Sequence, residues 1–280
     1  MYRPFEKALL YVVRGKKYLG FWNRFIPNPM LYKFNSIREV NRGGINYSLD
    51  LSCMMQWPIY WDLREKAREK LYSLIQKDDV VFDVGTNIGE TLLNFAKLTG
   101  EKGYAFGFEP DEENYKKLQK NISLNNFSNI HVFKNAVSDK KETVKLYCVD
   151  PHNRGMNRIL ENEGNVDYVY SIVESTTLDE IVEKNNIEKL DLIKIDIEGY
   201  EMHALRGAIR VLKRFRPILF VEIGYTRLIK NKTSPNELVK LLEDLGYSIS
   251  QAETDEKITS SHDFSYLQNN GFDLVAMPSK

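Results

Sequence analysis

The stretch VVFDVGTNIGETLLNFAKL, residues 80–98, changes its pattern in the middle, and this change determines the fold class. Residues 80–85 form a short apolar run that is typical of a buried strand, whereas residues 88–98 read as a helix. The glycines between them allow positive φ angles and let the backbone approach a ligand closely. The stretch therefore predicts a strand, a tight loop able to contact a ligand, and a helix in immediate succession.

The alternation of strands and helices continues along the chain. The segments expected to form strands are residues 103–110, 130–137, 143–149, 166–174, 190–197 and 217–223. The segments expected to form helices are residues 62–77, 111–125, 177–185, 201–215 and 234–246. This order predicts an α/β fold, a doubly wound, mostly parallel sheet with helices on both faces. The C-terminal stretches YSIS and FDLVAM are expected to close it as an antiparallel edge pair, and residues 45–52 to join a hairpin.

The composition excludes several classes of protein. The 280 residues are 42% apolar and 28% charged, as in an ordinary globular protein. Because 39 basic residues balance 39 acidic residues, we expect no nucleic-acid partner. Two distant cysteines, Cys53 and Cys148, provide neither a disulfide framework nor a zinc site. We see no membrane span and no signal-peptide pattern, and therefore expect a cytoplasmic protein.

The first 42 residues differ from the rest of the chain. They contain nine basic residues against two acidic ones, with many aromatic residues between Tyr2 and Phe34. This composition suits peripheral contact with an anionic membrane surface. The scattered placement of the aromatic residues favours instead a helical lid that packs on the main domain. Both readings stay open for an extension over residues 1–44, followed by one domain over residues 45–280.

Polar and small residues stand where the predicted strands end, which is where such sheets bind ligands. The first strand of this series ends in DVGTNIGE, which contains Asp83, Gly85, Asn87 and Gly89. Glu109 ends the second strand, at a spacing that suits a carboxylate accepting hydrogen bonds from both hydroxyls of a ribose. Asn135 and the small Ala136 end the third and leave room for a flat ring. Together these residues predict a nucleoside site.

Two cofactors compete for this site. A dinucleotide needs a third glycine and an uncluttered helix N-terminus for its pyrophosphate, but Asn87 replaces the middle glycine and Asp83 adds a negative charge. Carboxylates suit a sulfonium and an ammonium group. S-adenosylmethionine carries both, with a ribose and an adenine. A methyltransferase therefore fits better than the alternative of an NAD-dependent oxidoreductase.

Seven motifs in order carry a family resemblance: VVFDVGTNIGET, FEPDEENYKKLQKNISLNN, NAVSD, TLDEI, DLIKIDIEGYE, LRGA and PILFVEI. They resemble the FkbM family of S-adenosylmethionine-dependent methyltransferases, over about residues 45–277. The resemblance implies a Rossmann-like methyltransferase fold and O-methylation of hydroxyls on sugars and other secondary metabolites. It also implies that Asp83 and Gly85 line the methionine part of the cofactor, that Glu109 holds the ribose, and that Asn135 and Ala136 flank the adenine.

The segment DLIKIDIEGYE, residues 191–201, brings three carboxylates to the end of a strand. Methyl transfer to a hydroxyl requires alignment of the acceptor and removal of its proton. The resemblance places Asp196 facing the sulfonium and the acceptor, and Asp196 is our first candidate for the chemistry. Glu198 stays undecided between a catalytic role and a structural one. Glu201 is predicted to begin the following helix.

Residues 150–159 form a polar, turn-like insert that we interpret as a lid over the acceptor. His152 within it is a third catalytic candidate, its alternative being a solvated loop histidine. Asp196, Glu198 and Glu222 could serve as oxygen ligands for magnesium. Since the sequence contains no recognisable metal-binding loop, we predict a metal-free enzyme.

The expected acceptor is a small-molecule or lipid-linked glycan, and the oligomeric state stays open. A third reading is a non-catalytic scaffold with a methyltransferase fold and a membrane-tethering N-terminus. The intact cofactor loop argues against that reading.

Overall fold

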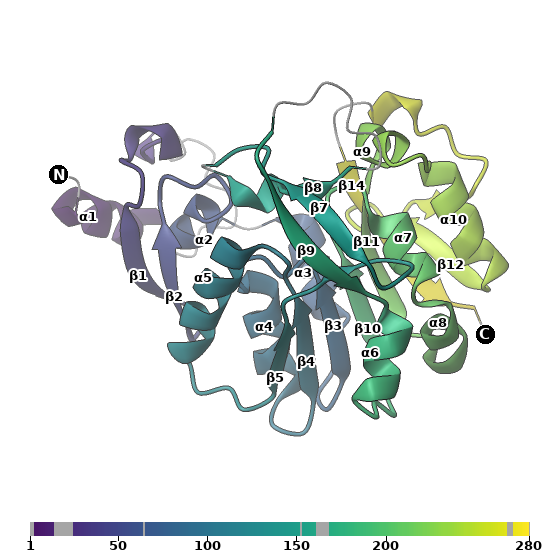
Figure 1. The fold of residues 1–280 in the computed structure, drawn as a ribbon. Coiled ribbons are helices and arrows are strands. Elements are labelled where there is room, and N and C mark those ends of the chain that lie inside the picture. The colour runs from purple at the N-terminus through teal and green to yellow at the C-terminus, as the bar shows by residue number, and fades with distance from the viewer. Residues whose placement is uncertain are drawn as a thin grey trace.

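The structure is a computed structural model of the chain, and it describes residues 3–13, 25–63, 65–151, 153–160, 168–267 and 271–279. The described part contains a central sheet with helices on both faces, a smaller second sheet and an N-terminal hairpin (Figure 1). No helix among the described residues is both long enough and apolar enough to cross a membrane.

The central sheet is mostly parallel. In spatial order its strands in the described ranges are β13 (Lys257–Ile258), β12 (Tyr247–Gln251), β14 (Gly271–Pro278), β11 (Ile218–Gly224), β10 (Leu192–Ile195), β3 (Val80–Val84), β4 (Tyr104–Phe108) and β5 (Ile130–Phe133). The five strands from β11 to β5 are parallel, whereas β14 is antiparallel to both β11 and β12. The predicted doubly wound sheet with an antiparallel C-terminal pair is confirmed, with β14 inserted between β11 and β12.

Helices cover the two faces of this sheet. One face packs against α6 (Leu178–Lys184), α7 (Glu201–Arg206), α8 (Ile209–Phe215), α9 (Tyr225–Lys230) and α10 (Pro235–Asp244). The other packs against α3 (Lys66–Ser73), α4 (Glu90–Thr99) and α5 (Glu112–Ser123). Successive residues of a strand point to opposite faces, so Phe82 joins the first core and Val81 the second. Both side chains are fully buried, which explains why the strands read as continuous apolar runs.

Two predicted elements are each divided in the structure. Residues 130–137 form β5 in the central sheet and then β6 (Ala136–Val137) in the second sheet, instead of one strand. Residues 201–215 form α7 and α8 instead of one helix. The interruption falls at Gly207, where a Cβ atom would lie 2.0 Å from the backbone oxygen of Ser138. The close approach of a distant segment therefore breaks the helical pattern.

The second sheet has the order β6, β9 (Tyr170–Thr176), β7 (Thr143–Tyr147) and β8 (Arg158–Ile159). In Figure 1, β7 and β9 pass in front of the central sheet. Between β7 and β8 lies the short helical turn η3 (Arg154–Met156), inside the insert that we interpret as a lid. Another short turn, η4 (Ser265–Leu267), precedes β14.

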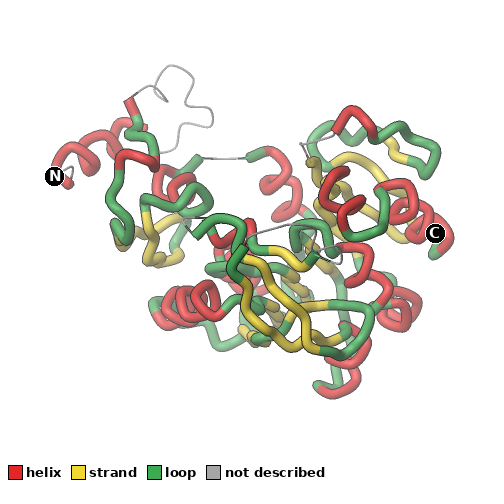
Figure 2. Tube along the Cα trace, turned by 45° about the horizontal axis from the view of Figure 1, so that its top comes forward, coloured by secondary structure: helices red, strands yellow, loops and turns green. Residues whose placement is uncertain are grey.

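The N-terminal part is built from α1 (Arg3–Val13), η2 (Pro29–Leu31), the antiparallel hairpin β1 (Ile37–Arg42) and β2 (Ile45–Asp50), and α2 (Trp57–Trp61). The hairpin expected around residues 45–52 is therefore present. It is fixed to α5 because the backbone N–H of Ser48 donates to Asn121 (2.8 Å) and that of Asn46 to Asn125 (2.9 Å). Figure 2 shows α1 and the C-terminal elements at opposite ends of the molecule.

Candidate active site

A cavity opens at the carboxyl ends of β3, β4 and β10, and its empty space is about 1050 Å³ including the solvent-open mouth. Seven of the predicted site residues line it: Gly85, Asn87, Glu109, Asn135, Ala136, Asp196 and Glu198. Asp83 lies fully buried beneath it in β3, and Gly89 precedes α4 outside the lining. His152 lies outside the described residues. The fold thus brings most of the predicted residues to one cavity.

The loop between β3 and α4 depends on positive φ angles at Gly85 (+82°), Asn87 (+50°) and Gly89 (+91°). At Gly85 a Cβ atom would also lie 1.9 Å from the backbone oxygen of Asp196, an impossible contact. Glycine is therefore obligatory at position 85. This close approach brings the loop against the segment that carries the acidic residues.

Glu109 is buried at the end of β4, and its carboxylate is held by backbone amides. Asn87 N–H donates to Oε2 (2.8 Å) and Asp111 N–H donates to Oε1 (2.9 Å). Burial raises the pKa of Glu109 to about 7. Since each carboxylate oxygen has two lone pairs, both can still accept a hydrogen bond from a ligand hydroxyl. The geometry is compatible with the ribose role, which stays a prediction.

Asn135 and Ala136 line the cavity next to Glu109, at the transition from β5 to β6, because β5 pairs with β4. Apolar side chains accompany them in the lining: Phe108, Val137, Leu146 and Ile159. An apolar slot with an amide at its edge suits a flat heteroaromatic ring. Their predicted role beside the adenine is consistent with this position.

Lys194 is a site residue that the sequence reasoning missed. It is buried in β10, in register with Asp83 of β3, and its Nζ lies 3.4 Å from Asp83 Oδ1, 3.3 Å from Asp196 Oδ2 and 3.2 Å from the carbonyl oxygen of Gly85. Burial alone would lower its pKa, but the charges of Asp196 and Asp83 raise it above its usual value. Lys194 is therefore a permanent buried cation between the two carboxylates. The signal for it was a lysine inside the apolar run LIKI.

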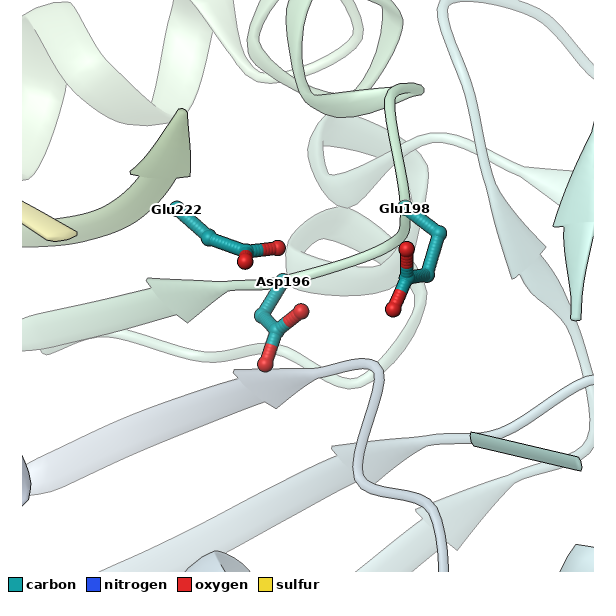
Figure 3. Close-up of side chains that lie close together, drawn as sticks. All are labelled: Asp196, Glu198 and Glu222. Carbon is teal, nitrogen blue, oxygen red and sulfur yellow. The ribbon is translucent and has the colours of Figure 1, made fainter. Parts of the chain in front are cut away.

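Three carboxylates gather at the carboxyl ends of β10 and β11: Asp196 and Glu198 beyond β10, and Glu222 near the end of β11 (Figure 3). One oxygen from each lies within 4.8 Å of the others. The strand β10 ends at Ile195, so Asp196 and Glu198 belong to its exit loop, where Glu198 has a φ of +57°. The predicted strand through residue 197 is therefore too long, yet the two side chains still converge.

The pKa values of Asp196 and Glu222 are shifted in opposite directions. Burial raises the pKa of Glu222 well above its usual value, and the charge of Asp196 adds to this rise. Burial acts in the same direction on Asp196, but the charge of Lys194 and a hydrogen bond with Glu222 outweigh it and lower the pKa. The side chain of Asp196 is 40% exposed and faces the open cavity. Asp196 is accordingly the member of the three that ionises most readily, and it is available to a ligand.

Arg227 of α9 joins two of these acids. Its Nη1 lies 3.1 Å from Glu198 Oε2 and its Nη2 2.5 Å from Glu222 Oε1. Three glycines make room for it, because Cβ atoms at Gly199, Gly224 or Gly271 would lie within 2.3–2.8 Å of its atoms. The oxygen cluster has the donor chemistry for a divalent cation, but Arg227 already supplies positive charge to two of its members.

Glu201 begins α7, as predicted, and also braces the loop before it. Its Oε1 accepts hydrogen bonds from Ile197 N–H (3.2 Å) and Gly199 N–H (2.9 Å). The side chain is completely buried, and burial raises its pKa to about 7. Glu201 therefore fixes the backbone that carries Asp196 and Glu198 without facing the cavity itself.

The insert between β7 and β8 covers the cavity from the other side. Arg154 forms an ion pair with Asp111, which also accepts a hydrogen bond from Asn157 Nδ2 (3.0 Å). A Cβ atom at Gly155 would lie 2.8 Å from Asn87 Nδ2. The insert thus packs directly against the β3–α4 loop, as expected for a lid.

Comparison with known proteins adds an independent line of observation. A family model described as the methyltransferase FkbM domain matches residues 83–249. The hexuronic acid methyltransferase AglP of Haloferax volcanii is 24% identical over 207 residues, covering 70% of this chain and 82% of that protein. The 2-O-methyltransferase NoeI of Sinorhizobium fredii is 24% identical over 193 residues, covering 63% and 76%.

A crystal structure of methyltransferase FkbM from Methylobacillus flagellatus is similar to 78% of this chain with 22% identity and a TM-score of 0.47. The matching region covers 50% of that longer protein, so this chain spans about half its length.

Proposed function

Because the chain belongs to the methyltransferase FkbM domain family, it is a methyltransferase, and we propose that it transfers the methyl group of S-adenosylmethionine to a sugar hydroxyl. One observation carries this proposal: the glycine loop, Glu109 and Asp196, whose pKa is lowered, line the same cavity. Family membership favours this function over the oxidoreductase and the scaffold.

In this proposal the β3–β4 side holds the cofactor. Gly85, Asn87 and Gly89 shape the loop around its methionine part, and Glu109 accepts hydrogen bonds from its ribose. Asn135 and Ala136 flank its adenine. Asp83 is buried beneath the cavity and acts indirectly, through its ion pair with Lys194, whose Nζ lies 3.4 Å from Asp83 Oδ1. The negative charge around Asp196 suits the sulfonium group.

The β10–β11 side deprotonates and orients the acceptor. S-adenosylmethionine supplies a methyl group on a sulfur that leaves as a thioether. The acceptor oxygen forms its new bond to that methyl carbon as the carbon–sulfur bond breaks, and the hydroxyl proton passes to a carboxylate. Asp196 is the proposed proton acceptor and aligning group, with Glu198 beside it. His152 is a further candidate from the lid.

The proposed acceptor is a glycan or a related polyhydroxy metabolite, either free or lipid-linked. The names of the two relatives, a hexuronic acid methyltransferase and a 2-O-methyltransferase, support this class. Polar side chains at the acid side of the cavity are suited to binding several hydroxyls at once.

For the extension over residues 1–44, we further propose that α1 packs on the main domain and that η2 touches an anionic membrane. Leu9 and Val13 are buried in one cluster with Tyr47 and Trp61, which supports a packed extension. Met30 and Leu31 are 87% and 64% exposed at the tip of η2, which supports membrane contact. Sedimentation with phosphatidylglycerol vesicles should show about tenfold weaker binding of a variant carrying Met30→Ser and Leu31→Ser. Unchanged binding would remove the membrane proposal.

The function as a whole is tested by ligand binding and an acceptor screen. Calorimetry should show binding of S-adenosylhomocysteine and no binding of NAD. Labelled S-adenosylmethionine should then transfer its methyl group to at least one member of a panel of sugars and lipid-linked glycans. Binding of NAD in preference to S-adenosylhomocysteine would contradict the proposal.

A further inference from the structure

Among the residues that the structure describes, each basic side chain lining the cavity except one forms an ion pair with a carboxylate. The basic residues in its lining are Arg68, Arg154, Arg158 and Lys194. Arg68 pairs with Glu90, Arg154 with Asp111, and Lys194 with Asp196. Within the described ranges, the guanidinium of Arg158 forms no ion pair, and its Nε donates only to the Met156 carbonyl oxygen at 3.4 Å. One cation of the cavity therefore has both terminal amino groups available to a ligand.

Arg158 occupies a defined place beside the acid cluster. It belongs to β8, whose next residue, Ile159, is buried against Ala136 and Tyr200. Burial raises the pKa of Glu198, and the positive charge of Arg158 is among the charges that oppose this rise. Arg158 thus projects its charge onto the side of the cavity where we place the acceptor.

We propose that Arg158 binds a carboxylate of the acceptor, which makes the preferred substrate an acidic sugar. This inference rests on the proposed function and identifies the class of sugar. A planar guanidinium binds a carboxylate through two parallel hydrogen bonds. Without such a cation, an anionic acceptor would be repelled by Asp196 and Glu198.

The cofactor carries a carboxylate too, on its methionine part, so the same chemistry has two sources. The position of Arg158 favours the acceptor. Ile159, which follows Arg158, packs in one cluster with Ile197, the residue between Asp196 and Glu198, whereas the residues proposed for the methionine part, Asp83 and Gly85, lie at β3. The experiment below separates the two sources.

The test compares two acceptors that differ only in the carboxylate, methyl β-D-glucuronide and methyl β-D-glucoside. Wild-type protein should methylate the glucuronide with a kcat/KM at least about tenfold higher, the size expected for one charged hydrogen-bonded contact. Arg158→Gln should remove that preference by raising KM for the glucuronide about tenfold, with little change for the glucoside. Arg158→Lys keeps the positive charge but lacks the planar guanidinium, so it should retain part of the preference for the glucuronide.

Arg210→Gln is the matched control, because Arg210 is an exposed arginine of α8 that pairs with Asp179 and Glu183. It should leave both acceptors unchanged. A wild-type preference for the glucoside, or an equal loss on both acceptors in Arg158→Gln, would overturn the inference. Weaker S-adenosylhomocysteine binding in Arg158→Gln would overturn it too, by assigning the contact to the cofactor.

A direct binding measurement keeps the inference distinct from the proposed function. Saturation-transfer NMR on protein loaded with S-adenosylhomocysteine compares binding of the two methyl glycosides to the wild type and to Arg158→Gln. Stronger glucuronide binding that is lost in the variant supports the inference, even where wild-type protein methylates neither sugar and the proposed function fails. Equal binding of both glycosides to the wild type contradicts it.

Discussion

The two sides of the cavity are held together by different kinds of contact. On the β3–β4 side the contacts involve the backbone. Gly85 packs against a carbonyl of the neighbouring loop, and Glu109 accepts hydrogen bonds from backbone N–H groups. On the β10–β11 side the contacts are ion pairs between side chains. Lys194 lies between two carboxylates, and Arg227 lies between two others. Substitutions on the β3–β4 side should therefore destabilise the fold through steric conflict. Substitutions on the β10–β11 side should destabilise it by leaving a buried charge without its partner.

The largest effect is expected from Gly85→Ala. The added Cβ would lie 1.9 Å from a backbone oxygen, at a φ of +82°. We expect a loss of about 3 kcal/mol or more in the free energy of unfolding. Thermal and urea unfolding measure it. Gly43→Ala is the matched control, since Gly43 also has a positive φ (+55°) but no atom within 4 Å of an added Cβ, and should lose only about 1 kcal/mol. Equal losses in the two variants would contradict the steric account.

Lys194→Met should test the charged side. It leaves Asp83 and Asp196 without their shared cation, and removing one partner of a buried ion pair costs about 3 kcal/mol of stability. Lys240→Met removes an exposed lysine paired with Asp244 and should cost less than about 1 kcal/mol. Urea unfolding of both variants at pH 7 gives the comparison, and similar small losses would show that Lys194 is dispensable.

The sign of the pH dependence sharpens this prediction. Burial raises the pKa of Asp83, and Lys194 opposes that rise. Without Lys194 the folded-state pKa rises further above the unfolded value of about 3.9, so the ionised acid destabilises the fold at higher pH. The stability deficit of Lys194→Met should therefore be greatest near pH 7 and shrink towards pH 4. A deficit that grows on acidification would contradict this.

The smallest effect concerns the pH dependence of cofactor binding. Burial raises the pKa of Glu109 to about 7. If its ionised form accepts the ribose hydroxyls, S-adenosylhomocysteine affinity falls as the pH drops through 7, by at most about tenfold per pH unit. Calorimetry between pH 5.5 and 8.5 measures it, and Glu109→Gln should bind more weakly with a flatter pH profile. An unchanged profile in that variant would assign the dependence to another buried acid, such as Glu201.

The same contrast explains what the sequence could predict. Apolar strand runs and the glycine loop are local signals, so the sheet, the site at its carboxyl edge and most of the cavity residues were accessible. The division of residues 201–215 was not, because it depends on the approach of Ser138 to Gly207. Nor was the division of residues 130–137, since the pattern does not indicate that Phe133 and Ala136 join different sheets.

The acid side was harder to predict because its counter-charges come from distant positions. Asp196 and Glu198 were visible as charges at a strand end. Arg227 lies about thirty residues further along the chain, and only the fold brings it into ion pairs with Glu198 and Glu222. Lys194 was visible in sequence, but its role depends on its register with Asp83.

The most direct test of the account is the turnover of Asp196→Asn at saturating S-adenosylmethionine and acceptor. Asn keeps the size of the side chain and removes the charge, so an intact fold with lost proton transfer is expected. The account predicts a kcat at least about tenfold below wild type, in protein that still unfolds cooperatively because Lys194 keeps Asp83 as its partner. A kcat near the wild-type value would contradict the central claim that Asp196 serves the methyl transfer.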